Sequence, residues 1–550
     1  MTDWNAGITR RLVLAGAGAL PLAAAFAAEP ASRLARGSVF EDLDGSTLRP
    51  ANAPGIAGVM VSNGRDVVVT AQDGRYQIPV SPGQSIFVIK PSGWISPLAS
   101  GTNLPRFSYV YMPDGTPAAL DLRYRGVDPT GPLPAQIDFP LRKQVESDRF
   151  DVFLLTDPQP EDADELCFVR DDVIAQLPKA ADAAFGITLG DLMFDDLSLY
   201  ARHNRIFGTV GVPWFNVTGN HDMNYEAPDN FYSRETWKRV FGARYHAWNW
   251  GAATFFALDN VEYLGNDKYH GRFGDDQLAF VAAVLSKLPR ERLVVFCMHI
   301  PLATVLADDP HNVIADSAAF LRLIRDRPNT LSFSGHTHTN EHWYLDAGGG
   351  PAHHHHVLSA VCGSWWSGPF DARGIPVAVA WDGAPNGFHI LSVDGTQASC
   401  RLVPAHDPAQ GKMRLMFDAA FHTSGPEEAR DQPQPDLVPP PIALSALDGA
   451  HLVVNLFEGG PKSNVAWRLN RQTSWRPATR VAAKDPYCVE LFARNSATVK
   501  PWVTPQISTH LWQAALPSDL VAGTHRIEVR SRDEYGVETT AQLVFEVLEG

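Results

Sequence analysis

The chain has 550 residues, of which 45% are hydrophobic and 19% are charged, and its formal net charge is −15. This length exceeds what one compact core accommodates, so two to four domains are expected. The excess of acids and the lack of a basic stretch argue against a general nucleic-acid binder, which needs cations to neutralise phosphates. The five cysteines are scattered and odd in number, which does not fit a disulfide framework.

The first 27 residues have the pattern of an export signal. Arg10 and Arg11 precede an apolar run from Leu12 to Ala28, which contains the small residues of a cleavage site. The paired arginines resemble a twin-arginine signal, a type that exports folded proteins. An N-terminal membrane anchor is the alternative. The sequence therefore predicts a periplasmic or extracellular protein that engages the export machinery.

Two stretches of the chain are rich in short strands and turns. Over residues 36–145, alternating runs flank turn signals such as Asn63-Gly64 and Asp73-Gly74, which predicts an N-terminal β-rich accessory domain. Residues 399–550 show the same texture after a proline-rich connector, which predicts a second, sandwich-like β domain.

Between these stretches, residues 146–398 predict an α/β domain. Continuous apolar runs alternate with candidate helices at about 164–177, 275–288 and 314–325. Buried strands that alternate with helices indicate layered α/β architecture. Each apolar run ends in polar residues, and in open α/β sheets ligands gather at those strand ends.

Five of the strand ends carry Asp, Asn, Gln or His, which are ligand types that suit first-row metal ions. Any one of these residues could merely cap a strand, whereas the ordered set is specific. The groups in chain order are Asp157-Pro158-Gln159, Gly190-Asp191, Gly219-Asn220-His221-Asp222, His299 and Gly335-His336-Thr337-His338.

In this order the groups resemble the calcineurin-like metallophosphoesterase family, in the subset that has accessory domains at both ends. One departure is Gln159, where most members carry His. The resemblance implies a four-layer αββα core flanked by two β-rich, sandwich-like domains. It also implies a metal-dependent phosphoric ester hydrolase with two divalent or trivalent ions, Fe, Zn or Mn. Two ions about 3.5–4 Å apart clamp a phosphoryl group and turn a bridging water into a hydroxide nucleophile.

The resemblance also assigns roles to residues. The first ion would be held by Asp157, Gln159 and His338, the second by Asn220, His299 and His336, and Asp191 would bridge both. His221 would not be a ligand but would assist the leaving group, with Asp222 fixing its orientation and keeping it cationic. An extended backbone would point His336 and His338 to opposite sides, so a turn, made easier by Gly335, must aim them at different ions.

The implied substrate is an extracytoplasmic phosphate ester, with a diester favoured: a nucleotide, a glycerophosphodiester or a phosphorylated glycan. One alternative is a phosphomonoesterase or nucleotide pyrophosphatase with the same centre. Another alternative is a non-catalytic protein that binds a cell-surface polymer. The intact ligand set and His221 argue against this alternative.

Several further residues have two interpretations. Trp365 and Trp366, followed by Asp371, either form an aromatic wall over the metals or place one ring in the core and one at a domain junction. Asp195 is a candidate for supporting the site, and His203 is expected on a helix surface. The run His353–His356 is expected at a solvated loop edge with one inward residue and no metal of its own.

Overall fold

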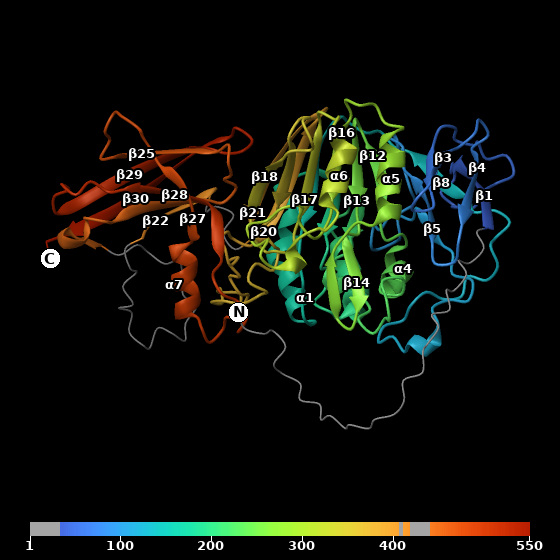
Figure 1. Ribbon diagram of the computed structural model, residues 1–550, viewed down its shortest axis with the longest axis horizontal. Helices are drawn as coiled ribbons and strands as arrows, with labels where there is room; N and C mark the ends of the chain where they lie inside the picture. The colour runs from blue at the N-terminus through green and yellow to red at the C-terminus, as the bar shows by residue number, and fades with distance from the viewer. Residues whose placement is uncertain (1–32, 406–410, 419–440, 550) are drawn as a thin grey trace, which may run out of the picture.

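The computed structural model describes residues 33–405, 411–418 and 441–549, so the predicted signal at residues 1–27 lies outside the described residues. Three parts follow one another along the long axis of the molecule (Figure 1). The N-terminal β module lies at one end, the α/β core in the middle and the C-terminal β domain at the other end.

The N-terminal module is built from two four-stranded sheets, ordered β4-β1-β8-β6 and β3-β2-β5-β7. The predicted turn at Asn63-Gly64 joins β2 and β3, which pair antiparallel. The strands are β1 (Arg33–Glu41), β2 (Met60–Ser62), β3 (Val67–Val69), β4 (Arg75–Val80), β5 (Ser85–Ile89), β6 (Trp94–Ile95), β7 (Ser108–Val110) and β8 (Phe139–Lys143).

Two sheets form the middle of the core. The first has the order β11-β10-β9-β20-β21 and consists of β9 (Arg149–Leu155), β10 (Ala183–Leu189), β11 (Trp214–Val217), β20 (Gly387–Asp394) and β21 (Gln397–Pro404). The second has the order β12-β13-β16-β17-β19-β18 and consists of β12 (His246–Trp250), β13 (Ala253–Ala257), β16 (Leu293–Cys297), β17 (Thr330–Ser334), β18 (Glu341–Leu345) and β19 (His353–Val357). A separate hairpin pairs β14 (Val261–Gly265) with β15 (Lys268–Gly271).

Helices cover the outer faces of both sheets, which confirms the four-layer αββα core. Side chains of α1 (Glu165–Phe168), α2 (Leu177–Ala180) and α3 (Tyr200–Gly208) pack on the first sheet. Those of α5 (Asp275–Leu285) and α6 (Ser317–Ile324) pack on the second. The helix α4 (Glu235–Phe241) lies below α5 in the view of Figure 1. Between the sheets, residues such as Leu154 and Ile187 pack against Phe255 and Val295 from the facing strands.

The C-terminal domain is a sandwich of a four-stranded and a five-stranded sheet. Its elements are β22 (Met413–Phe417), β23 (Ile442–Ala443), β24 (His451–Leu456), β25 (Asn464–Leu469), β26 (Arg476–Pro477), β27 (Thr479–Lys484), α7 (Pro486–Arg494), β28 (Ile507–Ala515), β29 (Gly523–Arg532) and β30 (Glu538–Leu548). The predicted boundary at residue 399 falls inside β21, which pairs with β20 in the core sheet, so in the structure the core extends to Pro404.

The four consecutive histidines are not at a solvated loop edge, as the sequence suggested. They form β19, which pairs with β17 on one side and β18 on the other, and three of the four are buried. Hydroxyl groups of β17 supply partners: Ser332 Oγ lies 2.8 Å from His353 Nε2 and 2.7 Å from His355 Nδ1. Because these hydroxyls replace water, the imidazoles can be buried despite their polarity.

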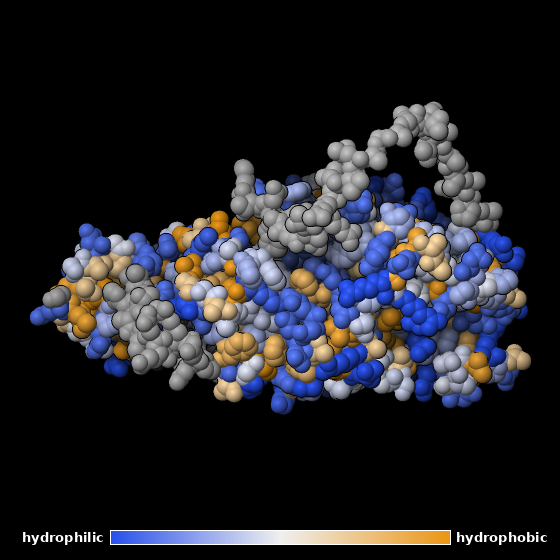
Figure 2. All heavy atoms as spheres, turned by 90° about the horizontal axis from the view of Figure 1, so that it is seen from below, coloured by the Kyte–Doolittle hydropathy of each residue, from blue (hydrophilic) through white to orange (hydrophobic). Residues whose placement is uncertain are grey.

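Hydrophilic residues cover much of the face shown in Figure 2, with apolar residues scattered among them. Within the described ranges, no helix is long and apolar enough to cross a membrane.

Candidate metal centre

The predicted ligands gather at one edge of the two core sheets, where parallel strands end. Residues 157 and 159 follow β9, residue 191 follows β10, residue 220 follows β11, residue 299 follows β16, and residues 336 and 338 follow β17. The structure therefore brings together all seven predicted ligands: Asp157, Gln159, Asp191, Asn220, His299, His336 and His338.

His299 lies at the centre of one half of this cluster. Its Nε2 is 3.2 Å from Asp191 Oδ2, 3.0 Å from Asn220 Oδ1 and 3.2 Å from His336 Nδ1. Its Nδ1 is 2.9 Å from the carbonyl oxygen of Leu189, which accepts a hydrogen bond and fixes the ring. That contact leaves Nε2 with a lone pair that faces the neighbouring ligand atoms, as in metal-binding imidazoles.

The other half of the cluster is built around Asp157 and His338. His338 Nε2 lies 3.5 Å from Asp157 Oδ1, and its Nδ1 donates to the Gly363 carbonyl oxygen at 2.8 Å. The Gln159 amide lies 2.9 Å from Asp191 Oδ2. Exchange of the near-isosteric oxygen and nitrogen of this amide would aim its carbonyl oxygen into the cluster.

Strained backbone is concentrated in the same residues. Five of the seven predicted ligands have positive φ angles: Asp157 (48°), Gln159 (42°), Asp191 (51°), His336 (72°) and His338 (50°). Each such residue costs on the order of 1–3 kcal/mol and persists only where the surrounding structure imposes it. The turn that aims His336 and His338 is thus made by the histidines themselves.

Gly335 serves a different purpose from the predicted one, because its φ is not positive. A Cβ atom there would lie 1.6 Å from Thr156 Oγ1 and 2.2 Å from Asp157 Oδ2. At Gly219 a Cβ atom would lie 2.1 Å from Asp191 Oδ1. Both glycines are therefore required by close approach to a carboxylate of the cluster.

The residues present fit a pair of metal ions. The carboxylates of Asp157 and Asp191 are fully buried, where unpaired charge is costly. Imidazole nitrogens, carboxylate oxygens and an amide oxygen converge in this cluster. One ligand atom from each of Asp191, His299 and His336 lies within 4.8 Å of the other two. Hard and borderline donors of this kind suit divalent or trivalent first-row ions.

His221 lies beside the cluster and is held by Asp195. Its Nδ1 is 2.7 Å from Asp195 Oδ1, its backbone N–H donates to Asp191 Oδ1 at 2.9 Å, and its ring stacks on Phe194 with 4.6 Å between centroids. Burial alone would lower the pKa of His221, but the carboxylates of Asp191 and Asp195 raise it to about 9. The contact with Asp195 occupies Nδ1 and leaves Nε2 as the other ring nitrogen.

Asp222 does not orient His221, so the predicted role was wrong. Its carboxylate accepts hydrogen bonds from the backbone N–H groups of Gly219 and Leu192 and from the Tyr200 hydroxyl, at 2.9, 3.2 and 2.9 Å. Burial and the nearby charge of Asp191 raise the pKa of Asp222 to about 6. Asp222 therefore joins the loops that carry Asp191 and His221.

The two tryptophans take different places. Trp365 stacks on His338 with 4.0 Å between ring centroids, whereas Trp366 is buried and donates from Nε1 to the Pro158 carbonyl oxygen at 2.8 Å. Asp371 accepts hydrogen bonds from Arg373 and Ile375 within its own loop. Trp365 thus lies against a predicted ligand, Trp366 supports the loop of another, and Asp371 stabilises a turn.

The sequence analysis did not identify two aromatic residues at the site, and it placed one histidine of the core wrongly. Phe194 comes three residues after Asp191 and stacks on His221, and Trp502 from the C-terminal domain stacks on Phe194 at 6.4 Å between centroids. The only sequence signal for Phe194 was its proximity to the Gly-Asp group, and Trp502 had no such signal. His203, expected on a helix surface, is fully buried, and burial lowers its pKa to about 4.

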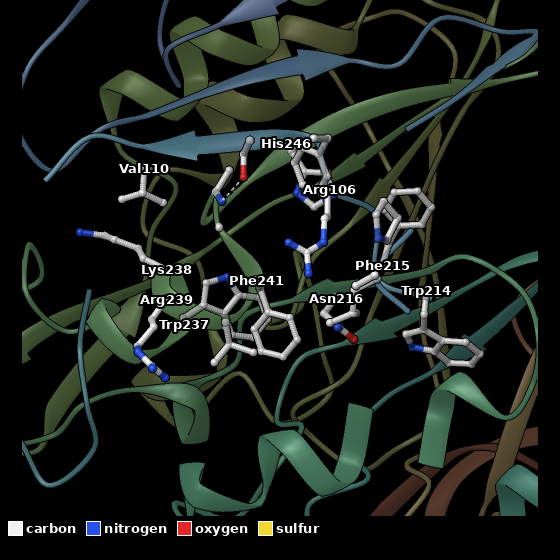
Figure 3. A pocket seen from close by; sticks show the side chains of 18 residues that line it. Arg106, Val110, Trp214, Phe215, Asn216, Trp237, Lys238, Arg239, Phe241 and His246 are labelled. Atoms are coloured by element: carbon white, nitrogen blue, oxygen red, sulfur yellow. Dashed lines mark hydrogen bonds between the residues drawn. The ribbon is translucent and has the colours of Figure 1, made fainter. Parts of the chain in front are cut away.

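A pocket of about 350 Å³ lies elsewhere, between the N-terminal module and the core (Figure 3). Arg106 reaches it from the N-terminal module, and Trp214, Asn216, Trp237 and His246 line it from the core. It includes none of the seven predicted ligands and is separate from the candidate metal centre.

Comparisons with known proteins agree with this geometry. Three family models match: the N terminal of calcineurin-like phosphoesterase over residues 44–124, calcineurin-like phosphoesterase over residues 152–340, and the C terminal of calcineurin-like phosphoesterase over residues 355–538. The chain belongs to the calcineurin-like phosphoesterase family with accessory domains at both ends. It is a metal-dependent phosphoric ester hydrolase, and the family implies a dinuclear metal centre.

Two solved structures are similar to parts of the chain. A dimetal phosphatase from Danio rerio is 13% identical, with 46% of this chain and 98% of that chain covered and a TM-score of 0.31. The purple acid phosphatase PPD1 from yellow lupin (Lupinus luteus) seeds is 12% identical, with 67% of this chain and 66% of that chain covered and a TM-score of 0.33. Comparison with curated proteins gave no match.

Proposed function

We propose that the protein is an exported phosphodiesterase whose seven converging side chains hold two metal ions. Asp157, Gln159 and His338 would hold one ion, Asn220, His299 and His336 the other, and Asp191 would bridge them. The observation that carries the proposal is the convergence of these side chains on strained backbone at one sheet edge. Two such ions supply charge that polarises a phosphoryl group and lowers the pKa of a water molecule.

His221 is proposed to supply the proton to the leaving oxygen. The contact with Asp195 holds Nδ1, so that Nε2 is available on the substrate side. Stacking on Phe194 fixes the plane of the ring. A general acid must lie within hydrogen-bond reach of the departing atom, and contacts at its edge and its face would hold the ring in one position for that transfer.

Two aromatic pairs, one next to His221 and one next to His338, support a diester rather than a monoester. Phe194 stacks on His221 and Trp502 stacks on Phe194. Trp365 stacks on His338, and Trp381 meets Trp365 edge to face. A diester carries an organic group on each side of the phosphorus, and each group can lie against one of these aromatic pairs. A nucleotide, glycerophosphodiester or phosphorylated glycan with two ester bonds meets this description.

The metal-loaded protein is expected to hydrolyse bis(4-nitrophenyl) phosphate with a kcat/KM about tenfold or more above that for 4-nitrophenyl phosphate, a ratio that one apolar contact can supply. Steady-state kinetics on both esters measures it. A preference for the monoester would favour the phosphomonoesterase alternative, and hydrolysis of neither ester, nor of nucleotide pyrophosphates, would contradict catalysis.

Export is proposed on the basis of the pattern in residues 1–27. Replacing Arg10 and Arg11 together by Lys is expected to keep the protein in the cytoplasm, because the paired arginines are the recognised feature. Cell fractionation followed by immunoblotting measures the distribution. The matched control is Arg36→Lys, at an exposed position of β1, which should not change the distribution. Unchanged export of the double variant would contradict a twin-arginine route.

A further inference from the structure

A second group of metal-ligand side chains lies where the core meets the C-terminal domain. His356 belongs to β19, His389 belongs to β20, and Glu458 follows β24. One ligand atom from each lies within 4.8 Å of the other two, and all three side chains are buried. No member of this group is a ligand of the candidate dinuclear centre.

The polar atoms of this group lack the partners that buried polar atoms usually have. Within the described part of the chain, neither ring nitrogen of His389 and neither carboxylate oxygen of Glu458 has a hydrogen-bond partner. Burying a carboxylate and an imidazole without hydrogen-bond partners costs free energy, unless another group binds their polar atoms. A cation placed between them would satisfy both residues.

The spacing fits such a cation. His389 Nε2 lies 3.3 Å from Glu458 Oε1, although the two atoms do not form a hydrogen bond. In a tetrahedral zinc site, bonds of about 2.0–2.2 Å place neighbouring ligand atoms roughly 3.3–3.6 Å apart. The observed separation is therefore that of two atoms that share one ion.

The third imidazole is held in place by groups around it. Asn340 Oδ1 accepts from His356 Nε2 at 2.9 Å, and the ring of His342 stacks on His356 with 3.9 Å between centroids. Nδ1 is therefore the nitrogen that would bind the cation, in place of its 3.3 Å contact with the Tyr535 hydroxyl. Contacts of this kind fix the tautomer and the plane of metal-binding histidines. His342 Nε2 is itself buried without a hydrogen-bond partner among the described residues.

We infer that His356, His389 and Glu458 bind one structural divalent cation of the zinc class. Two imidazoles and a carboxylate are ligands that zinc accepts. This site revises the expectation that the histidine run binds no metal.

The position of the site suggests what the cation does. His389 pairs with Leu154 of β9, and His356 pairs with Phe333 of β17. These partners come three residues before Asp157 and His336, a distance of about 10 Å along each strand. The cation would join both core sheets to the C-terminal domain directly below the loops that hold the catalytic ligands.

Elemental analysis of the full-length protein tests the site. Glu458→Gln and His389→Ala are each expected to lower the metal content by one equivalent per chain and to reduce the melting temperature, while hydrolysis continues. The matched control is His525→Ala, since His525 is a buried histidine of the C-terminal domain that lies outside the group of three, with its ring nitrogens at Asn470 and Val521, and it should lose no metal. Metal content equal to wild type in both test variants would overturn the inference.

A second measurement needs no variant. Crystals of the wild-type protein grown with zinc chloride should show an anomalous difference peak between His389 Nε2 and Glu458 Oε1. Absence of that peak, with the His389–Glu458 ion pair alone in its place, would also overturn the inference.

Discussion

Replacing Asp191 by Asn or Ala is expected to abolish hydrolysis and to lower the metal content. Asp191 lies between the two halves of the cluster, 3.2 Å from His299 Nε2 and 2.9 Å from the Gln159 amide. A carboxylate can share its two oxygens between adjacent cations, which an amide does poorly. Metal ions contribute several kcal/mol to such transition states, so the rate should fall by roughly a thousandfold or more.

Elemental analysis and steady-state kinetics of the Asp191 variants measure both effects. Asp346→Ala provides a matched control, because Asp346 is exposed and accepts hydrogen bonds only within its own turn. Full metal content together with wild-type activity in Asp191→Asn would show that the ions are not held as proposed.

Replacing His221 by Ala is expected to keep both catalytic ions and to slow hydrolysis by roughly 10²–10⁴-fold, the contribution of a general acid. The loss should be large for alkyl diesters and small for nitrophenyl diesters, because a leaving group of low pKa needs no proton. Asp195→Asn should show the same dependence on the leaving group with a smaller loss, since Asp195 acts through His221.

Rates for a series of diesters with leaving groups of increasing pKa measure this dependence. His451→Ala is the matched control, because His451 is a surface histidine of the C-terminal domain that pairs with Asp418. If His221→Ala slowed every ester equally, the residue would act in binding or in stabilising charge and not as the acid.

The strands of the core and the metal ligands at their ends could be predicted because each is marked by a short pattern of neighbouring residues in the sequence. Apolar runs that end in Asp, Asn or His marked the strands and their ends, and parallel strands bring such ends to one edge. The seven predicted ligands converge for that reason. The layered α/β architecture followed from the alternation of buried strands with helices, and its four layers were implied by the family resemblance.

The residues that the sequence did not reveal depend on tertiary contacts. Asp222 is next to His221 in the chain, yet a 3₁₀ turn directs it to Tyr200, and Asp195 from another loop takes its expected place. Trp502 reaches the site from a different domain, so no local pattern could indicate it. The buried histidine run depends on serine hydroxyls of the neighbouring strand, which alternation along β19 alone does not show.

The most direct test of the dinuclear centre is anomalous diffraction from crystals of the full-length protein, recorded at the absorption edge of the metals that elemental analysis identifies. Two peaks are expected on either side of Asp191, one within coordination distance of Asp157, Gln159 and His338 and the other of Asn220, His299 and His336. A single peak, or peaks that lie away from Asp191, would contradict the assignment of these residues to two bridged ions.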